Sequence, residues 1–166
     1  IHYPVLNKKN DIIASAVTNL DLHDISRASK TYGVKSFYVV TPLKDQQLLV
    51  HKIVSHWTEG IGGVNNPSRQ EALKLIKIEE TLNDVIKDIE SIEKITPKII
   101  ATSARIINDD YISYGKCREL LFNGDPYVII LGTAWGMANE IITNSDYTLA
   151  PIRSGFEYNH LSVRSA

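Results

Sequence analysis

Cysteine is almost absent from this chain of 166 residues, because Cys117 is the only one. A disulfide framework within the chain is therefore excluded, and a reducing compartment such as the cytoplasm is the natural expectation. Long apolar runs are also missing: none approaches the ~18 residues that a membrane helix needs, so we expect no membrane anchor. No signal-peptide pattern opens the chain.

An excess of either sign of charge is missing as well. The formal net charge is −1 at pH 7, while 43% of the residues are apolar and 22% are charged, as in ordinary globular proteins. Without a global basic field, a nucleic acid has to bind a local patch or a second subunit. The length suits a single domain over residues 1–166. Because the chain starts at Ile1 and stops where a helix should begin, we expect it to be trimmed or part of a longer protein.

Several catalytic motifs are absent. No Gly-x-Ser-x-Gly or Walker pattern occurs, which removes the usual basis for acyl or phosphoryl transfer. A nucleotide-dependent oxidoreductase needs a Gly-x-Gly-x-x-Gly turn after its first strand, and the chain has none. His2, His51 and His56 show no metal-ligand spacing, so we expect no metal site. Cys117 lies on an apolar helix face, which is more typical of a core residue than of a nucleophile.

The remaining pattern is an alternation of short apolar runs and amphipathic segments. Helices are expected to begin at caps Asp21, Thr41, Thr81 and Ser113, with Pro42 at the first position of the second one. Strands are expected at 2–5, 11–17, 35–40, 73–78, 98–101, 127–131 and 147–149, and a further short helix at 136–143. This alternation predicts an α/β fold with a mostly parallel sheet and helices on both faces. Segment 59–67 follows a helix, so its glycines predict a helix stop and a loop.

Three strand ends open into polar or glycine-containing loops, at 102–105, 132–136 and 151–163. In a parallel sheet the carboxyl ends lie along one edge, so these loops are expected to converge on a ligand. Gly132 and Gly136 lack Cβ atoms, which lets main-chain groups approach a nucleoside closely. A helix cap and tight turn is the alternative for Gly132. Asn159 and His160 have an alternative too, as the N-cap and first-turn residue of a helix, and both roles are compatible.

A second candidate group lies on the predicted helix that follows Asp21. His23 and Arg27 are four residues apart and share one helix face, away from the apolar stripe. Arg27 can bind a phosphate or orient a nucleophilic hydroxyl. The alternative is an exposed ion pair with Asp24, worth about 0–1 kcal/mol, and spacing alone favours it. Three further arginines are Arg105, Arg153 and Arg164. Each can be interpreted equally well as a ligand of a phosphate or as a solvated surface charge.

These residues resemble a known superfamily. The runs 132–136, 151–155 and 158–166, the last reading Tyr-Asn-His-Leu-Ser-Val-Arg-Ser-Ala, resemble the final two motifs of the SPOUT RNA methyltransferases. Residues 17–34 resemble the first motif, in which Arg27 matches its arginine. Over almost its full length the chain is similar to a family of small bacterial S-adenosylmethionine (SAM)-dependent RNA methyltransferases, related to the tRNA guanine-N1 methyltransferase. Ribose-methylating members usually carry Asn six residues before that arginine, where this chain has Asp21.

The resemblance implies a deep trefoil knot over about 99–166, a homodimer, SAM as cofactor, and tRNA or rRNA as substrate. It implies catalytic roles for Arg27, assisted by Asn19 and His23. The positions that it implies for cofactor binding are Thr102, Ser103, Ala104, Leu131, Gly132, Thr133, Gly136, Ile152, Gly155, Tyr158, Asn159, His160, Leu161 and Ser162. The alternative function is a non-catalytic, dimeric RNA-binding module that retains the cofactor pocket.

Overall fold

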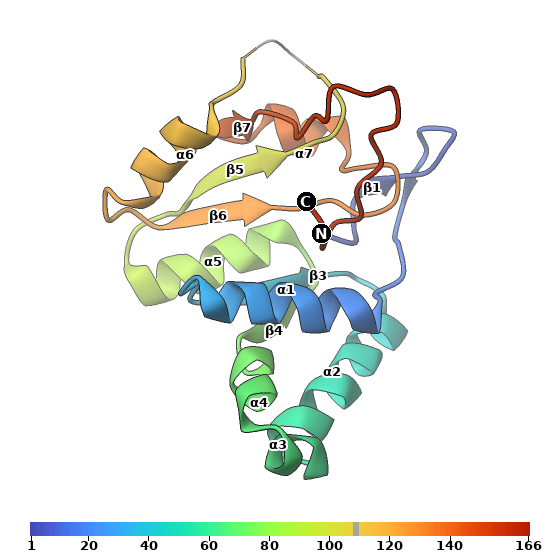
Figure 1. The fold of residues 1–166 in the computed structure, drawn as a ribbon, viewed down its shortest axis with the longest axis vertical. Coiled ribbons are helices and arrows are strands. Elements are labelled where there is room, and N and C mark those ends of the chain that lie inside the picture. The colour runs from blue at the N-terminus through green and yellow to red at the C-terminus, as the bar shows by residue number, and fades with distance from the viewer. Residues whose placement is uncertain (108–109) are drawn as a thin grey trace.

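The structure is a computed structural model that describes residues 1–107 and 110–166, in which short strands and helices alternate (Figure 1). The strands are β1 (Val5–Leu6), β2 (Ile12–Ile13), β3 (Phe37–Val40), β4 (Ile76–Glu79), β5 (Lys98–Thr102), β6 (Tyr127–Ile130) and β7 (Tyr147–Leu149). The helices are α1 (Asn19–Thr31), α2 (Lys44–Thr58), α3 (Ile61–Asn65), α4 (Pro67–Leu73), α5 (Leu82–Glu93), α6 (Tyr114–Leu121) and α7 (Asn139–Thr143).

Most strands pair in parallel, which confirms the predicted mixed α/β class. The β6-β5-β7 sheet and the β3-β4 pair are both parallel, whereas β1 and β2 form a short antiparallel pair. The sequence predicted one sheet, but the described strands form these three separate groups. An alternation of apolar and amphipathic segments indicates crossovers between parallel strands, but it does not say which strands share a ladder.

Each parallel sheet has its own hydrophobic core. Leu22, Val39, Val50 and Leu73 lie at the centre of the first core, which joins α1, α2 and α4 to β3 and β4. The second core surrounds β5 and includes Met137 beside Ala101, Ile130 and Ile142. Cys117 is buried, and burial raises the pKa of its thiol, so its predicted structural role is confirmed.

Two of the predicted helix caps are confirmed and two are wrong. Thr81 and Ser113 accept hydrogen bonds from the main-chain N–H groups of Asp84 and Lys116, as N-caps do. Helix α1 is capped by Thr18, which leaves Asp21 in the first turn. Helix α2 begins at Lys44 with Leu43 as its N-cap, so Thr41 and Pro42 lie before the helix. The Thr41 hydroxyl accepts from the Leu43 N–H at 3.3 Å, a local turn that competes with a helix cap.

The segment 59–67 is wrongly predicted as a loop, because it contains α3 and leads directly into α4. Gly62 and Gly63 are buried in α3. A Cβ at Gly63 would overlap the main-chain oxygen of Trp57, and one at Gly62 would lie 2.9 Å from Nε2 of His56. The two glycines therefore serve close packing of α3 on the end of α2, a role that their low helix propensity conceals in the sequence.

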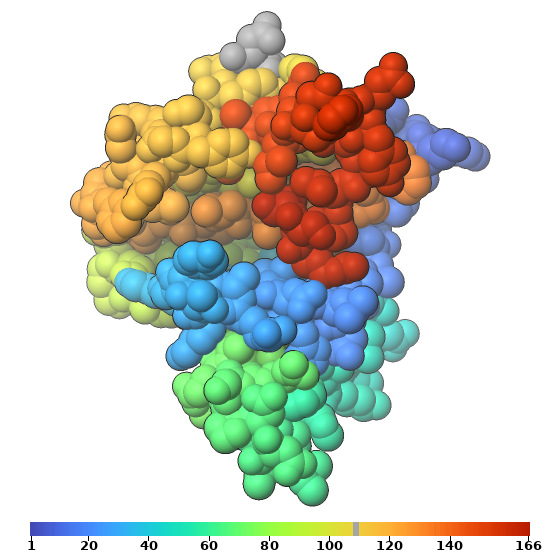
Figure 2. Space-filling model, in the orientation of Figure 1, coloured from blue at the N-terminus to red at the C-terminus, as the bar shows by residue number. Residues whose placement is uncertain are grey.

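The chain after β7 contains no helix or strand within the described residues up to Ala166. The predicted cap role of Asn159 is wrong, because no helix follows it; its amide instead donates to the Ile152 carbonyl at 3.0 Å. This C-terminal segment returns across the molecule to α1, and both chain ends lie near each other (Figure 1). Figure 2 shows the segment on one side of α1 and helices α3 and α4 on the other.

Candidate functional site

The three predicted ligand loops follow neighbouring parallel strands. In the central sheet Ile100 of β5 pairs with Ile129 of β6 on one side and with Tyr147 of β7 on the other. The hydroxyl of Thr102 donates to the Ile130 carbonyl at 2.9 Å and ties the ends of β5 and β6 together. Their carboxyl ends therefore share one sheet edge, as the sequence predicted, and this edge carries the loops that begin at 102, 131 and 150.

The loop after β6 is fastened to the N-terminal hairpin by main-chain hydrogen bonds. Leu6 donates to the Gly136 carbonyl at 2.8 Å, and Trp135 donates to the Leu6 carbonyl at 3.0 Å. The Thr133 N–H donates to the Ile1 carbonyl at 3.4 Å. Three contacts between segments far apart in the sequence hold this loop in one conformation, which is the preorganisation that a ligand site requires.

A half-buried chain of polar side chains extends this anchor. The hydroxyls of Ser15 and Thr133 lie 2.5 Å apart, and Nδ1 of His2 lies 3.0 Å from the Ser15 hydroxyl. Burial, the larger cause, lowers the pKa of His2 to about 4, so its imidazole is neutral at pH 7. Sequence analysis assigned no role to His2. Its structural role depends on the fold, which brings the N-terminal hairpin next to Thr133.

The glycines of this loop have structural reasons of their own. A Cβ at Gly132 would lie 2.5 Å from Cγ and 2.8 Å from the main-chain nitrogen of Met137. Gly136 has a φ of +98°, which side-chain-bearing residues rarely adopt. The tight turn, which was one alternative explanation for Gly132, is present: the Gly136 N–H donates to the Thr133 carbonyl at 3.0 Å. Neither main-chain polar group of Gly132 has a hydrogen-bond partner among the described residues, so both are available to a ligand.

Arg105 serves the same loop rather than an external phosphate. One of its terminal guanidinium nitrogens donates to the Met137 carbonyl at 3.0 Å and to the Asn139 side-chain oxygen at 3.2 Å. Its Nε is buried and has no partner within the described part of the chain. Ser103 accepts from the Arg105 N–H at 3.0 Å, which makes the loop after β5 a tight local turn that includes Ala104.

The last predicted loop, 151–163, is largely exposed. Gly155 has a φ of +80°, and the ring of Tyr158 lies 5.6 Å from that of His160. Tyr158 is 78% exposed and Phe156 is 82% exposed, which is unusual for aromatic side chains. The hydroxyl of Ser162 lies 2.8 Å from that of Ser165 and closes a turn at the end of the segment. The loop therefore presents apolar and main-chain groups that other residues leave uncovered.

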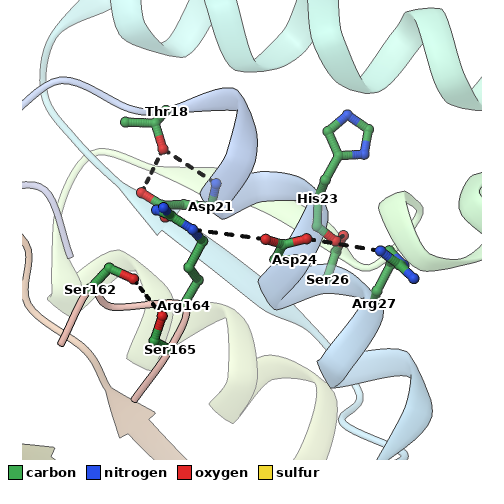
Figure 3. Close-up of polar contacts among 9 residues, drawn as sticks. All are labelled: Thr18, Asp21, His23, Asp24, Ser26, Arg27, Ser162, Arg164 and Ser165. Carbon is green, nitrogen blue, oxygen red and sulfur yellow. Dashed lines mark hydrogen bonds and ion pairs between the residues drawn. The ribbon is translucent and has the colours of Figure 1, made fainter.

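Arg164 connects this segment to α1. One of its terminal nitrogens donates to Asp21 at 3.0 Å, and its Nε lies 3.9 Å from Asp24 (Figure 3). The second oxygen of Asp24 lies 3.9 Å from Arg27, so charged groups connect the segment to Arg27. The ion pair expected between Asp24 and Arg27 is present at this long distance. Arg164 is therefore engaged within the chain, whereas no ion pair of Arg153 occurs among the described residues.

The three residues expected to be catalytic lie together on one side of α1. Asn19, His23 and Arg27 follow one another at four-residue intervals and line a groove of about 590 Å³ between α1, α2 and α4. The His23 ring extends away from Arg164 (Figure 3). The groove and the C-terminal segment thus lie on different sides of α1, which joins the two predicted groups of site residues.

The groove contains residues that sequence analysis missed. Trp57 lies at its side, with the His23 ring 5.2 Å and the His56 ring 5.4 Å away, both edge to face. The guanidinium of Arg69 lies 5.1 Å from the Trp57 ring centre, a cation–π arrangement. Burial, followed by the charge of Arg69, lowers the pKa of His23, so its ring is neutral at pH 7. Arg69 went unnoticed because α4 was not predicted.

Two further properties concern the described residues as a whole. They contain no group of three or more His, Cys, Asp or Glu side chains that could hold a metal ion. None of their helices combines the length and the apolar character needed to cross a bilayer.

Comparison with known proteins identifies the family. A family model for SAM-dependent RNA methyltransferases matches residues 1–166, the whole chain. The chain belongs to this family. The family match agrees with the resemblance found in the sequence motifs, and SAM is the methyl donor that the family description names.

Two relatives of this family member carry the name tRNA (guanine-N(1)-)-methyltransferase. The protein from Oleidesulfovibrio alaskensis is 43% identical and that from Nitratidesulfovibrio vulgaris 40% identical over 166 residues. Both matches cover 100% of this chain but only 38% of the relative. An uncharacterized protein from Aquifex aeolicus is 33% identical over 167 residues, covering 100% of this chain and 81% of the relative. A region similar to this chain thus forms a minor part of two longer proteins and most of a shorter one.

A solved structure supports the fold alone. A probable methylase family protein from Haemophilus influenzae superposes with a TM-score of 0.59 at 17% identity, covering 87% of this chain and 54% of that protein. At such low identity the similarity concerns the arrangement of strands and helices. The roles of individual residues in this family member stay predictions, including every cofactor-binding and catalytic residue named from the sequence.

Proposed function

We propose that this chain binds SAM at the edge of the β6-β5-β7 sheet and transfers its methyl group to RNA. The observation that carries the proposal is that the loops at 102–104, 131–136 and 150–162 follow neighbouring parallel strands, in a chain of this family. Ligands of open parallel sheets bind outside the carboxyl ends of the strands.

The groups present at this edge fit an adenosyl ligand. Main-chain N–H and C=O groups without protein partners can recognise a purine by hydrogen bonds. Both main-chain groups of Gly132 lack a partner among the described residues. Ile152 and Leu161 are exposed apolar side chains from the neighbouring loop, and they can cover the faces of a base. The remaining predicted contacts at this edge are Thr102, Ser103, Ala104, Leu131, Thr133, Gly136, Gly155, Tyr158, Asn159, His160 and Ser162.

SAM supplies an activated methyl group on a sulfonium, so the protein mainly has to orient the acceptor. Proximity and orientation can account for a large part of such a rate enhancement. Arg27 is exposed apart from its long contact with Asp24, and it lines the groove beside α1. Its proposed role is to hold and orient the RNA strand whose nucleophile reaches the methyl group. His23, neutral at pH 7, can accept a proton, and Asn19 can hold the RNA by hydrogen bonds.

The overall form of the site extends the proposal. We propose that residues 1–166 are one domain, with a deep trefoil knot over about 99–166 that threads the C-terminal segment through the loops. The contact between Arg164 and Asp21, 143 residues apart, agrees with a C-terminal segment that returns to the surface of α1. We also propose a homodimer, with the cofactor loops near its interface. Trp135, at 58% exposed, together with Phe156 and Tyr158, gives those loops an apolar surface for a partner.

The substrate proposed is tRNA in the cytoplasm, on the strength of the names of two relatives. Because this chain spans 38% of those proteins, the guanine-N1 activity in their names can belong to the other part of their chains. The proposal for this chain is therefore methylation of RNA, with tRNA tested first and rRNA second, and base and ribose positions both examined.

Calorimetric titration of the protein with SAM, followed by transfer of a labelled methyl group to total tRNA and rRNA, tests this function. The expected result is saturable SAM binding and label in one RNA fraction. Replacing Arg27 with Ala should leave the Kd for SAM unchanged and lower transfer by about 10²-fold, because orientation of the acceptor is lost. The matched control is Arg118→Ala on α6, an exposed arginine that is not among the predicted site residues and does not line the groove beside α1, which should leave both quantities unchanged.

The result of this experiment separates the enzyme from its alternative. SAM binding together with RNA binding, but without transfer to any RNA, would indicate a non-catalytic RNA-binding module. A folded protein that binds no SAM would contradict the cofactor assignment itself.

A further inference from the structure

The groove beside α1 continues into a second hollow. The first, of about 590 Å³, lies between α1 and α2, and the second, of about 420 Å³, lies between α1 and α4. Arg27 and Arg69 line both hollows, so they stand where the two meet. Together they form a continuous depression along one side of α1, which we call the α1 groove.

The α1 groove carries positive charge on a chain whose formal net charge is −1. Three cations, Arg27, Lys52 and Arg69, line the larger hollow beside a single carboxylate, that of Asp24. Asp24 is itself shared between Arg27 and Arg164, each at 3.9 Å. A local basic patch of this kind is how a protein without a global basic field attracts a polyanion.

Arg69 is the most informative of these residues. Within the described parts of the chain its guanidinium makes no hydrogen bond and no ion pair, and its Nε is buried without a partner. The guanidinium lies beside Trp57, 5.1 Å from the ring centre. Nδ1 of His23 is also buried and unpaired in the described structure. The terminal nitrogens of Arg69 are therefore donors in the groove that the described residues leave free for an external acceptor.

The larger hollow also contains apolar side chains. Leu20 and Ile53 line the larger hollow together with the Trp57 ring. A cationic rim over an apolar floor matches a nucleotide, whose phosphate is an anion and whose base and sugar are largely apolar on their faces. A simple inorganic anion would leave the apolar part of the groove unused.

We propose that the α1 groove binds the backbone of single-stranded RNA, with a phosphate at Arg69 and Lys52 and a nucleoside over Ile53 and Trp57. This inference rests on the proposed RNA methyltransferase function and adds the path that the RNA takes. The strand crosses from the larger hollow to the smaller one beside Arg27. The groove lies on the side of α1 opposite the C-terminal segment, so methyl donor and RNA anchor use different surfaces (Figure 2).

The test is equilibrium binding of a fluorescently labelled single-stranded RNA of about twelve nucleotides, measured by anisotropy at several salt concentrations. Arg69→Gln and Lys52→Gln each remove one positive charge from the groove. We expect each substitution to raise the Kd for RNA about tenfold and to reduce the salt dependence of binding by about one phosphate contact. The matched control, Lys87→Gln, removes one exposed charge from α5, which does not line the groove, and should leave both quantities unchanged.

The same proteins are titrated with SAM and their circular dichroism spectra are compared. A folded Arg69→Gln protein with wild-type SAM affinity and weakened RNA affinity supports the groove. Unchanged RNA binding in both groove variants would overturn it, even if SAM binding and methyl transfer stand. If the wild-type protein binds no RNA, the groove proposal also fails, and the SAM titration decides the cofactor site separately.

Free nucleotides distinguish the two possible sources of a nucleotide ligand. The groove spans two hollows, so the RNA strand should bind at least tenfold more tightly than AMP or GMP at the same salt concentration. Tighter binding of a free nucleotide than of the strand would contradict an RNA path and would make the groove a site for small molecules instead.

Discussion

At the scale of single residues, Gly132 is the position where packing and ligand binding meet. Packing explains why a glycine occupies this position, because a Cβ there would lie only 2.8 Å from the main-chain nitrogen of Met137. The unpaired main-chain groups of Gly132 make it equally suited to a ligand. A glycine in a loop is therefore weak support for ligand binding when the protein itself occupies the space, and only an experiment that measures both properties can separate them.

We expect Gly132→Ala to lower the free energy of unfolding by about 2 kcal/mol, because the new methyl group overlaps Met137 and the loop has to shift. SAM affinity should fall as well, since the same shift moves the main-chain groups that are proposed to hydrogen-bond the cofactor. Chemical denaturation and calorimetric titration measure the two effects. The matched control is Gly115→Ala in α6, whose Cβ would meet only the Ser113 hydroxyl, at 3.8 Å, and which should not destabilise the protein.

A Gly132→Ala protein with unchanged stability but no SAM binding would contradict the packing explanation. It would show that the glycine is required because the ligand approaches the main chain, as the sequence first indicated.

At the scale of elements, α1 separates two surfaces with different chemistry. Asp21 contacts Arg164 of the C-terminal segment, and His23 and Arg27 line the groove. Asp24 belongs to both surfaces, because it lies near Arg164 and also lines the groove beside Arg27. The i, i+3 and i+4 spacings of a helix keep these residues within one or two turns. In the proposed function, α1 would transmit a change in the C-terminal segment to Arg27 through Asp24.

We expect Asp21→Asn to release the C-terminal segment, because Arg164 loses the charge of its nearest partner while Thr18 can still donate to the new side chain. Amide hydrogen exchange in residues 158–166 should become faster. The Kd for SAM should rise about tenfold, which corresponds to about 1.4 kcal/mol. Hydrogen exchange read by mass spectrometry and calorimetry measure these two results.

The matched control for this contact is Lys116→Gln, which breaks an exposed ion pair with Glu119 on α6. Exposed pairs of that kind contribute about 0–1 kcal/mol, so neither the exchange rates nor the Kd should change. If Asp21→Asn also leaves both unchanged, the contact with Arg164 does not hold the segment.

At the scale of the whole molecule, exposed apolar side chains occur at several places on the described surface. Two groups of them are candidate interfaces: Trp135, Phe156 and Tyr158 on the loops at the sheet edge, and Ile61 and Val64 on α3. Exposed aromatic groups commonly mark interaction sites. We place the proposed homodimer interface at the first group, because the cofactor loops are proposed to lie near the interface. Helix α3 would then take no part in it.

We therefore expect sedimentation equilibrium to give a mass near twice the 18.6 kDa of the chain. Replacing Phe156 and Tyr158 together with Ser should raise the dimer dissociation constant at least tenfold, because apolar area no longer leaves water on association. The matched control replaces Ile61 and Val64 with Ser and should leave the mass unchanged. Dissociation in the α3 variant, with the loop variant still dimeric, would place the interface at α3.

Much of this protein follows from its sequence alone. The parallel α/β class follows because buried strands and amphipathic helices have different hydrophobic periods, and these alternate along the chain. Thr81 and Ser113 were identifiable as caps because their hydroxyls satisfy the free N–H groups of a first helical turn. The convergence of the loops after β5, β6 and β7 follows from parallel pairing. Family membership could be predicted because the run at 159–166 is specific.

Other properties depend on contacts between distant residues and were decided by the tertiary structure. Helix α3 exists because Gly62 and Gly63 pack closely on the end of α2, although glycine disfavours helices locally. Arg105 and Arg164 read as possible phosphate ligands, but the fold places acceptors beside them at 137–139 and in α1. Arg69 acquires its significance only next to Trp57. Local sequence sets helix and strand preferences, whereas the pairing of charges and the shape of a groove depend on which surfaces meet.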